Sequence, residues 1–168
     1  PLRLLKSDFK AAYRCCPILT DHLDFAQILV LDSEGVLHSS QQYAMPFGAV
    51  GAVYAWDRVG AAVSAIRRDW FLVPVIRYVD DLFWAETEES STSCRQMVLD
   101  IVSLLGFTLK PSKTPEPSTS LNILGVTVSH QAKTSGLVVS TVADEAKVSF
   151  WLKDIHDGLD SNALPLQL

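Results

Sequence analysis

The chain has 168 residues, of which 14 are Lys or Arg and 19 are Asp or Glu, so its formal net charge is −5. Hydrophobic residues make up 48% of the sequence, which excludes a disordered chain and suits one domain with a real core. The longest stretch free of charged or strongly polar side chains, residues 44–56, is shorter than the about 18 residues that a membrane-spanning helix needs. The acidic balance argues against a general nucleic-acid binder, because such proteins normally carry an excess of basic residues.

Cysteine and histidine usage narrows the class of protein further. The chain has three cysteines, two of them adjacent at Cys15 and Cys16, and it has no CxxC spacing. None of its histidines has a partner at metal-ligand spacing. The sequence therefore predicts neither a disulfide scaffold nor a zinc site, and it favours a reducing, intracellular compartment. Because Pro1 opens directly into a strand-like run, we expect the sequence to be part of a longer polypeptide.

The first part of the chain predicts three strands followed by a helix. Branched apolar residues favour strands at 2–9 and 25–32, and a third strand at 36–43 follows a turn signal. Apolar residues then recur every three or four positions, which predicts an amphipathic helix that ends before Pro74. This stripe consists of Val53, Trp56, Val59, Val63, Ile66 and Trp70.

The middle of the chain predicts a hairpin and a second helix. Two short apolar runs, residues 73–78 and 82–85, flank a pair of aspartates. Thr87 precedes two glutamates and suits a helix start, since acidic side chains favour the positive end of the helix dipole. Gly106 is the predicted end of this helix. Its buried stripe is expected to be Cys94, Met97, Val98, Ile101, Leu104 and Leu105.

The last part of the chain predicts two strands and a helix. A Pro- and Ser-rich connection at 111–120 leads to a final pair of strands at 121–129 and 137–141. Residues 141–144 form a capping-box pattern, so we expect the last helix to begin there. Its apolar face is predicted to carry Val148, Trp151, Ile155 and Leu159.

This order of elements predicts an α+β fold, in which helices pack on one face of a mainly antiparallel sheet. No glycine-rich phosphate loop follows the first strand, which disfavours a doubly wound nucleotide-binding fold. Three tryptophans, Trp56, Trp70 and Trp84, are expected to pack in the core rather than to stack on bases. The mixed-charge run Arg67, Arg68 and Asp69 is interpreted as a solvated helix end.

Asp80 and Asp81 are the first residues that suggest chemistry. Adjacent carboxylates repel one another, and a hard divalent cation such as magnesium relieves that repulsion through oxygen ligands. Aspartate is also common in hairpin turns, where it bonds to its own backbone, so this pair alone is weak evidence. Asp8 at the end of the first strand is equally ambiguous alone. Together, three carboxylates at the ends of adjacent strands suit two metal ions, as in polymerases and nucleases.

Five segments, in order, resemble the motifs of the reverse transcriptase family. They have the sequences LKSDFKAAY, MPFG, YVDD, GFTLKPSKT and LNILG, at residues 5–13, 45–48, 78–81, 106–114 and 121–125. The resemblance covers about residues 4–128 and is that of the palm region of a retroelement enzyme. It implies RNA-directed DNA polymerase activity, in which deoxynucleotides are added to a primer 3′ end on an RNA or DNA template.

The resemblance also implies a metal site. Asp8, Asp80 and Asp81 would hold two magnesium ions, with manganese as an alternative, and the Phe9 carbonyl would be an extra ligand. Lys113 matches a position proposed to protonate pyrophosphate, although a lysine in a loop is more often simply solvated.

Further residues are assigned by the resemblance to nucleotide and primer. Tyr13 matches a steric gate that excludes a ribose 2′-hydroxyl, with packing beside the cysteines as the plainer interpretation. Phe47 and Gly48 are expected to line the nucleotide pocket. Tyr78 and Val79 are expected beneath the primer end, and Gly125 in a hairpin that grips the primer.

We expect residues 1–142 to form the palm and residues 143–168 to begin a thumb or connection, with the fingers upstream. Because the fingers normally supply cations for the triphosphate, the isolated chain is expected to polymerise poorly.

The main alternative is a decayed or domesticated palm that is retained for nucleic-acid or protein binding. There are three further alternatives: an RNA-dependent RNA polymerase, a nucleotide cyclase, and an unrelated domain with a chance YVDD sequence. Val79 and Tyr13 disfavour the RNA-dependent RNA polymerase. Three of the negative charges belong to the aspartates of the predicted metal site, and bound divalent cations would offset them. The net acidity is therefore a weaker argument against nucleic-acid binding.

Overall fold

The computed structural model describes residues 1–134 and 136–160, so the predicted tail beyond residue 160 and the side chain of Leu159 lie outside the described part. Strands and helices together form a mixed α+β fold, as predicted. The strands are β1 (Leu2–Asp8), β2 (Gln27–Leu31), β3 (Leu37–Gln41), β4 (Ile76–Tyr78), β5 (Asp81–Thr87), β6 (Ser120–Ile123), β7 (Val126–Lys133) and β8 (Gly136–Ala143). The helices are α1 (Val50–Phe71), α2 (Glu88–Leu104) and α3 (Glu145–Asp160), with short 3₁₀ helices η1 (Ala12–Cys15), η2 (Thr20–Phe25) and η3 (Pro111–Lys113).

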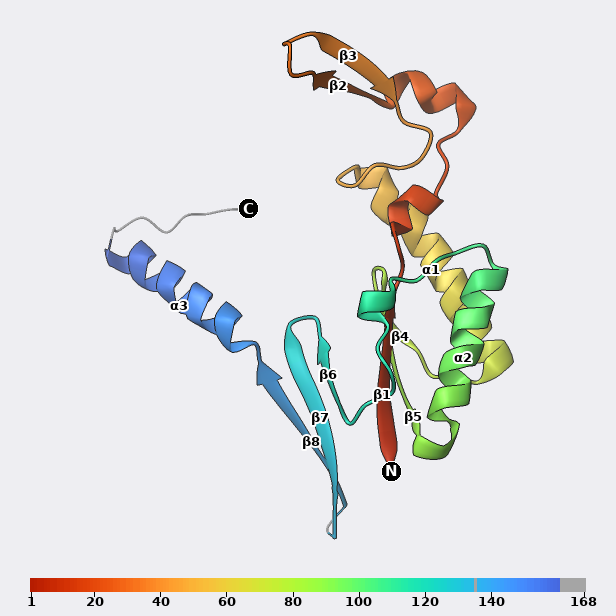
Figure 1. Ribbon diagram of the computed structural model, residues 1–168, viewed down its shortest axis with the longest axis vertical. Helices are drawn as coiled ribbons and strands as arrows, with labels where there is room; N and C mark the ends of the chain where they lie inside the picture. Colours follow the sequence, from red (N-terminus) through yellow and green to blue (C-terminus); the bar gives the residue numbers. More distant parts are fainter. Residues whose placement is uncertain (135, 161–168) are drawn as a thin grey trace.

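The centre of the molecule is an antiparallel sheet in the order β1-β5-β4. β1 pairs with β5 along its whole length, and this register places Asp8 opposite Asp81. The helices α1 and α2 lie on one side of this sheet (Figure 1), which confirms the predicted arrangement of helices on one face. Because the helices cover this face, apolar side chains of β1 and β5 are buried between the two layers.

The core joins the sheet to both helices. Phe9 packs edge-on against Trp56 of α1, with ring centroids 4.9 Å apart, and against Phe107 after α2, at 5.7 Å. Trp56 and Trp84 are buried, so the prediction that they pack in the core is confirmed. The remaining residues of this core cluster are mostly aliphatic: Leu5, Ala12, Cys16, Val63, Val73, Leu82, Cys94, Val98, Val102 and Leu109.

The buried face of α1 differs from the predicted stripe. Its buried residues are Ala52, Trp56, Gly60, Val63 and Arg67, and the predicted core residue Trp70 is 78% exposed. The prediction for Trp70 is wrong because this residue lies in the last turn of α1, beyond Arg67, the final buried position of the helix. Gly60 is on the buried face, where a Cβ would lie 2.9 Å from a guanidinium nitrogen of Arg77.

Arg67 also corrects the sequence interpretation. It is fully buried rather than solvated, and its guanidinium carbon lies 4.7 Å from the centre of the Trp84 ring. Burial lowers the pKa of Arg67 to about 10. Its guanidinium nitrogens have no hydrogen-bond partner among the described residues. Arg68 and Asp69 do form an exposed ion pair of 2.7 Å, as expected of a solvated helix end.

The second helix begins and ends where its sequence predicts. The Thr87 hydroxyl accepts a hydrogen bond from the Ser90 N–H at 3.4 Å and so caps α2. Gly106 follows the helix with a positive φ of 80°. Two residues of the predicted stripe, Leu104 and Leu105, are exposed instead of buried because they lie in the last turn, where the helix is ending.

The predicted final pair of strands is in fact three strands, β6-β7-β8. The predicted strand 121–129 is divided by a two-residue turn at Leu124 and Gly125, both with positive φ, so that Ile123 pairs with Val126. Helix α3 begins later than predicted, since Thr141 still pairs with Val128 in the sheet.

Asp144, rather than Thr141, caps the last helix. Its carboxylate accepts hydrogen bonds from the Ala146 and Lys147 N–H groups at 3.0 and 3.3 Å.

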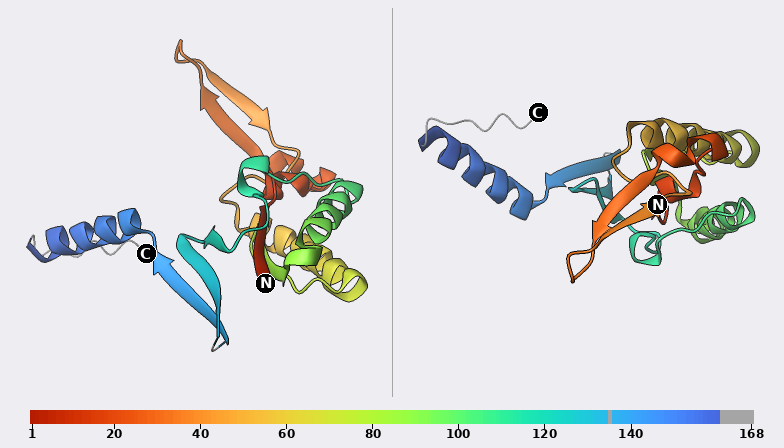
Figure 2. Two further views of the ribbon diagram at one scale, coloured as in Figure 1. Left: turned by 60° about the horizontal axis from the view of Figure 1, so that its bottom comes forward. Right: turned by 90° about the horizontal axis from the view of Figure 1, so that it is seen from above.

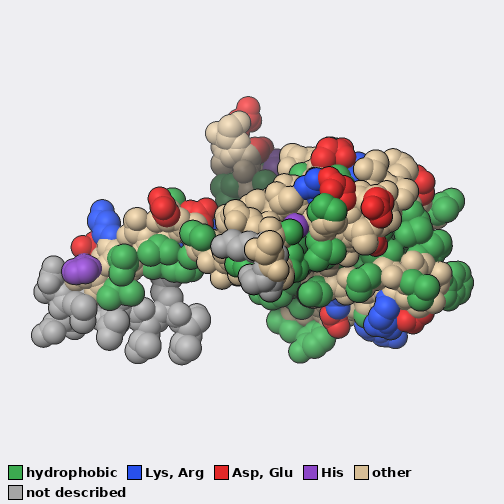
Figure 3. Space-filling view, turned by 90° about the horizontal axis from the view of Figure 1, so that it is seen from below, with side chains coloured by type: hydrophobic (Ala, Val, Ile, Leu, Met, Phe, Trp, Pro, Cys, Tyr) green, Lys and Arg blue, Asp and Glu red, His purple; other side chains and the backbone are tan. Residues whose placement is uncertain are grey.

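Two parts of the chain extend away from the central sheet. The β2–β3 hairpin projects at one end, and β7, β8 and α3 form an arm on another side (Figure 2). Apolar side chains on the arm, including Trp151 and Ile155, are exposed (Figure 3). Within residues 1–134 and 136–160, no helix has the length and apolar character to span a membrane.

Candidate functional site

The three predicted aspartates meet at one end of the central sheet. Asp8 is the last residue of β1 and lies opposite Asp81, the first residue of β5. Asp80 occupies the turn between β4 and β5, where its carbonyl accepts a hydrogen bond from the Phe9 N–H at 3.2 Å. Burial, followed by the charges of Asp8 and Asp80, raises the pKa of Asp81. The sheet register therefore concentrates negative charge at this position.

Two lysines balance part of this charge. Lys110 and Lys113 place their ammonium nitrogens 2.7 and 2.8 Å from the two carboxylate oxygens of Asp8, which is only 2% exposed. The hydrogen bond and the charge of Asp8 raise the pKa of Lys113. Lys113 was singled out by the sequence motif, whereas Lys110 was missed. In the part of the chain that the structure describes, no group of three or more His, Cys, Asp or Glu side chains is placed to hold a metal ion.

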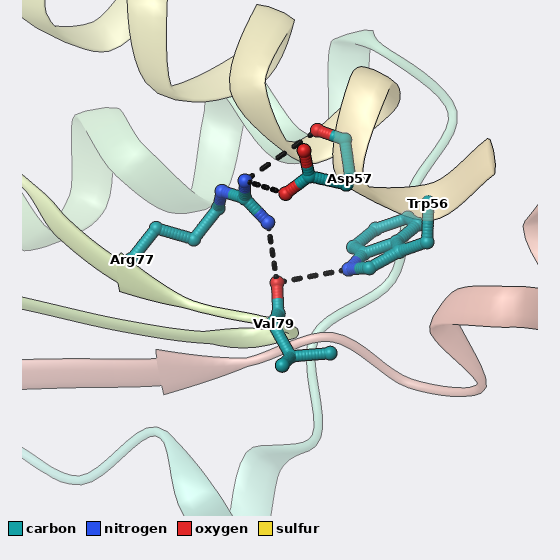
Figure 4. A network of polar contacts seen from close by, with 4 residues as sticks. All are labelled: Trp56, Asp57, Arg77 and Val79. Atoms are coloured by element: carbon teal, nitrogen blue, oxygen red, sulfur yellow. Dashed lines mark hydrogen bonds and ion pairs between the residues drawn. The ribbon is translucent and has the colours of Figure 1, made fainter. Parts of the chain in front are cut away.

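The turn that carries Asp80 has a strained backbone. Val79 has a positive φ of 54°, a conformation that is costly for a β-branched residue. Its carbonyl accepts hydrogen bonds from Trp56 Nε1 at 2.9 Å and Arg77 Nη1 at 3.0 Å, and Arg77 also pairs with Asp57 of α1 (Figure 4). Helix α1 thus holds the turn in place.

Trp56, Asp57 and Arg77 were not identified as site-supporting residues from the sequence. Val79 was assigned to the primer end, and in the structure its carbonyl is bonded to Trp56 of α1 and to Arg77 of β4. No short-range signal connects these residues, because about 20 positions separate the helix from the turn.

A cavity of about 290 Å³ lies on one side of the aspartates. The predicted nucleotide-pocket residues Tyr13 and Phe47 both line it, with ring centroids 5.7 Å apart. Gly48 follows with a positive φ of 89° and is not among the lining residues. The cavity is lined by Ala11, Ala12, Tyr13, Arg14, Phe47, Asp80 and Lys110.

A larger cavity of about 570 Å³ lies on the other side. It contains the predicted primer residues Tyr78 and Gly125, and it brings the β6–β7 turn beside Asp81. Lys6, Lys113 and Lys147 line it from three different elements. Lys6 also donates a hydrogen bond to the Asn122 carbonyl at 2.7 Å and so links β1 to β6. The other lining residues are Phe83, Asn122 and Leu124.

Arg95 of α2 holds the loop that carries both lysines. Its guanidinium donates to the carbonyls of Thr114 and Pro115 at 3.1 and 3.2 Å and pairs with Glu116 at 3.1 Å. At the start of the loop, the Lys110 N–H donates to the Asp8 carbonyl at 2.8 Å. The loop is therefore fixed both to the helix layer and to the end of β1. Sequence reasoning missed Arg95, which lies on a helix outside every motif.

Comparisons with known proteins show a likeness of fold. No protein-family model and no curated protein sequence matches the chain. Among solved structures, it is similar to a foamy viral protease-reverse transcriptase in complex with an RNA/DNA hybrid, with a TM-score of 0.61 and 17% sequence identity. The match covers 76% of this chain and 16% of that chain, so this chain corresponds to a small part of that enzyme. At this identity the likeness shows the fold alone: the chain has an α+β fold similar to that of part of a reverse transcriptase.

Proposed function

We propose that this chain is the palm of an RNA-directed DNA polymerase, which adds deoxynucleotides to a primer 3′ end on an RNA or DNA template. One observation carries the proposal. Asp8, Asp80 and Asp81 meet between two cavities, of which one contains Tyr13 and Phe47 and the other contains residues of the YVDD strand and the β6–β7 turn. This arrangement separates the residues expected to contact the nucleotide from those expected to contact the primer.

The donor set suits magnesium or manganese. Carboxylate oxygens are the ligands that these ions prefer, and the raised pKa of Asp81 reflects burial and charge repulsion that a cation would relieve. Asp8, Asp80 and Asp81, with the Phe9 carbonyl, would hold the ions. When bound, two such ions supply charge neutralisation at the reacting phosphate and at the attacking and leaving oxygens.

The side chains of this protein would select and orient the reactants. In the smaller cavity, the half-buried Tyr13 ring lies against Phe47 and would leave no room for a ribose 2′-hydroxyl. In the larger cavity, Tyr78 and Gly125 would contact the primer end. Val79 would keep the turn between them rigid through its bonds to Trp56 of α1 and Arg77 of β4.

The experiment that tests the proposal combines metal binding with nucleotide addition. Mn²⁺ binding is measured by electron paramagnetic resonance, and addition of one deoxynucleotide is followed on a labelled primer annealed to RNA. We expect Asp80→Asn to weaken Mn²⁺ binding at least about tenfold and to remove the low level of addition that the chain alone is expected to support. Asp21→Asn, which removes an exposed carboxylate of η2, is the control and should change neither. Equal Mn²⁺ binding by Asp80→Asn and the wild type would overturn the metal site.

A second candidate function is a non-catalytic palm, retained for binding nucleic acid or protein. One observation favours it: both carboxylate oxygens of Asp8 are already paired with lysines, which take the place that a metal would need. A palm of this kind would bind no Mn²⁺ and add no nucleotide, and the Asp80→Asn variant would then behave like the wild type in both assays.

A further inference from the structure

Lys110 and Lys113 are directed to different sides of the site. Lys110 lines the smaller cavity with Tyr13, Phe47 and Asp80, whereas Lys113 lines the larger cavity on the side of Asp81. The cavity expected to take the nucleotide therefore contains Lys110. It does not contain Lys113, the lysine that the family resemblance assigns to pyrophosphate.

The backbone explains why both lysines reach Asp8. Lys110 immediately precedes the 3₁₀ turn η3 and Lys113 ends it, and side chains three residues apart in a 3₁₀ turn lie on the same side. The Lys110 N–H is bonded to the Asp8 carbonyl, and the Lys113 N–H is bonded to the Lys110 carbonyl at 3.0 Å. Each ammonium group then meets a different oxygen of Asp8. The two lysines thus share one carboxylate but line different cavities.

Lys110 has a second cation beside it. Arg14 of η1 lines the same cavity, and its guanidinium donates to two neutral oxygens, the side-chain carbonyl of Gln42 and the backbone carbonyl of Ala44. Among the described residues Arg14 pairs with no carboxylate. The cavity thus has two cations and one carboxylate, Asp80, in its lining. A multiply charged phosphate chain is the ligand that such a lining favours, because hydrogen bonds between charged groups are stronger than neutral ones.

We propose that Lys110, together with Arg14, binds the polyphosphate of the incoming nucleotide, and that Lys113 acts on the primer side. This inference rests on the proposed function, since that function places the nucleotide in the smaller cavity. Lys110 acts here as a fixed cation, and the proposal requires no proton transfer. Both lysines pair with Asp8 in the free protein, but Lys110 would bind the nucleotide and Lys113 would act on the primer.

The test measures binding of inorganic tripolyphosphate to the 168-residue chain by calorimetry in EDTA. We expect Lys110→Met to weaken binding about tenfold or more, the effect of one lost charge-assisted hydrogen bond. Lys110→Arg, which keeps the charge, should bind within about threefold of the wild type. Lys113→Met, which removes the other Asp8 partner, is the matched control and should change binding less than about twofold. Equal losses in Lys110→Met and Lys113→Met, or no tripolyphosphate binding by the wild type, would overturn the proposal.

Two further measurements complete the design. Arg14→Met is a second test of the cavity that leaves the Asp8 ion pairs intact, so it should weaken tripolyphosphate binding even if Lys110→Met folds poorly. Fluorescence anisotropy of a labelled primer–template should show the reverse pattern, with weaker binding by Lys113→Met than by Lys110→Met. Because the calorimetry uses neither metal nor primer, its failure is distinct from failure of the polymerase proposal. Loss of Mn²⁺ binding in Asp80→Asn together with unchanged tripolyphosphate binding in Lys110→Met would overturn only the inference.

Discussion

At the scale of single residues, the site is organised around Asp8. This buried carboxylate has two ammonium partners, and Asp81 lies opposite it with a weaker set of compensating charges. The effects of Lys113 and Lys6 on the pKa of Asp81 are smaller than the opposing effects of burial and the two neighbouring aspartates. Removing the charge of Asp81 should therefore stabilise the folded protein, as is common for residues kept for function rather than stability.

The effect of Asp81 on the stability of the folded protein should depend on pH. Its folded pKa lies above the ordinary 3.8, so the folded state binds more protons between 3.8 and the raised value. The stability contribution of Asp81 is therefore present at low pH and is lost as pH rises through this window. Without divalent cations, Asp81→Asn should raise the Tm at pH 7 by a few degrees, and the difference should shrink toward pH 3.

Thermal melts across this pH range in EDTA check the prediction, with Asp21→Asn as an exposed control. An unchanged or lower Tm of Asp81→Asn at pH 7 would contradict the assigned repulsion.

At the scale of elements, α1 has two contacts with the central sheet that a hydrophobic stripe does not reveal. One is the bond from Trp56 to the Val79 carbonyl, which joins the helix to the turn that carries Asp80. The other is Arg67, whose guanidinium is buried over Trp84 of β5. A buried cation without hydrogen-bond partners costs desolvation energy that a ring contact only partly offsets.

Replacing Arg67 with an apolar residue of similar length should stabilise the protein. We expect Arg67→Met to raise the free energy of unfolding by about 1–3 kcal/mol, because the desolvation cost disappears while the packing on Trp84 remains. Urea denaturation measures the change. Arg68→Met, at the neighbouring exposed position, should stay within about 0.5 kcal/mol of the wild type. A loss of stability in Arg67→Met would mean that the guanidinium itself supports the contact between α1 and β5.

At the scale of the whole molecule, the chain combines a covered central sheet with two projecting parts. The β2–β3 hairpin forms a sheet of its own, and α3 continues from β8 along the arm. Leu29 and Leu31 point to the same face of the hairpin and are both 67% exposed. Exposed apolar strands of this kind promote association between molecules.

We expect the isolated chain to self-associate at high concentration through this hairpin. The double variant Leu29→Lys with Leu31→Lys should shift it toward monomer, because two charges on the apolar face disfavour its burial. Its stability should change by less than about 1 kcal/mol, since both side chains are largely solvated. Light scattering after size-exclusion chromatography measures the mass. Thr92→Lys with Ser93→Lys, on the exposed side of α2, adds the same charge elsewhere and should leave association unchanged.

The sequence by itself determined the order and type of most elements and the identity of the three aspartates. These depend on short-range features: the branched apolar run of β1, the Thr87 cap of α2 and the polar pair within the β4–β5 hairpin. Patterns of this kind reflect backbone hydrogen bonding between near neighbours, so they can be read from adjacent residues. The boundary between β6 and β7 was missed because Leu124 adopts a positive φ that its side chain does not predict.

Only the tertiary structure decided which residues share the site. Lys113 and Asp8 are 105 positions apart, and the sheet register together with the Arg95-bound loop brings them to 2.8 Å. The same long-range packing turned Arg67 inward, over the Trp84 ring of β5, and left Trp70 exposed. Such contacts depend on how separate elements pack and on charges that meet only after folding. Local sequence patterns carry no record of them.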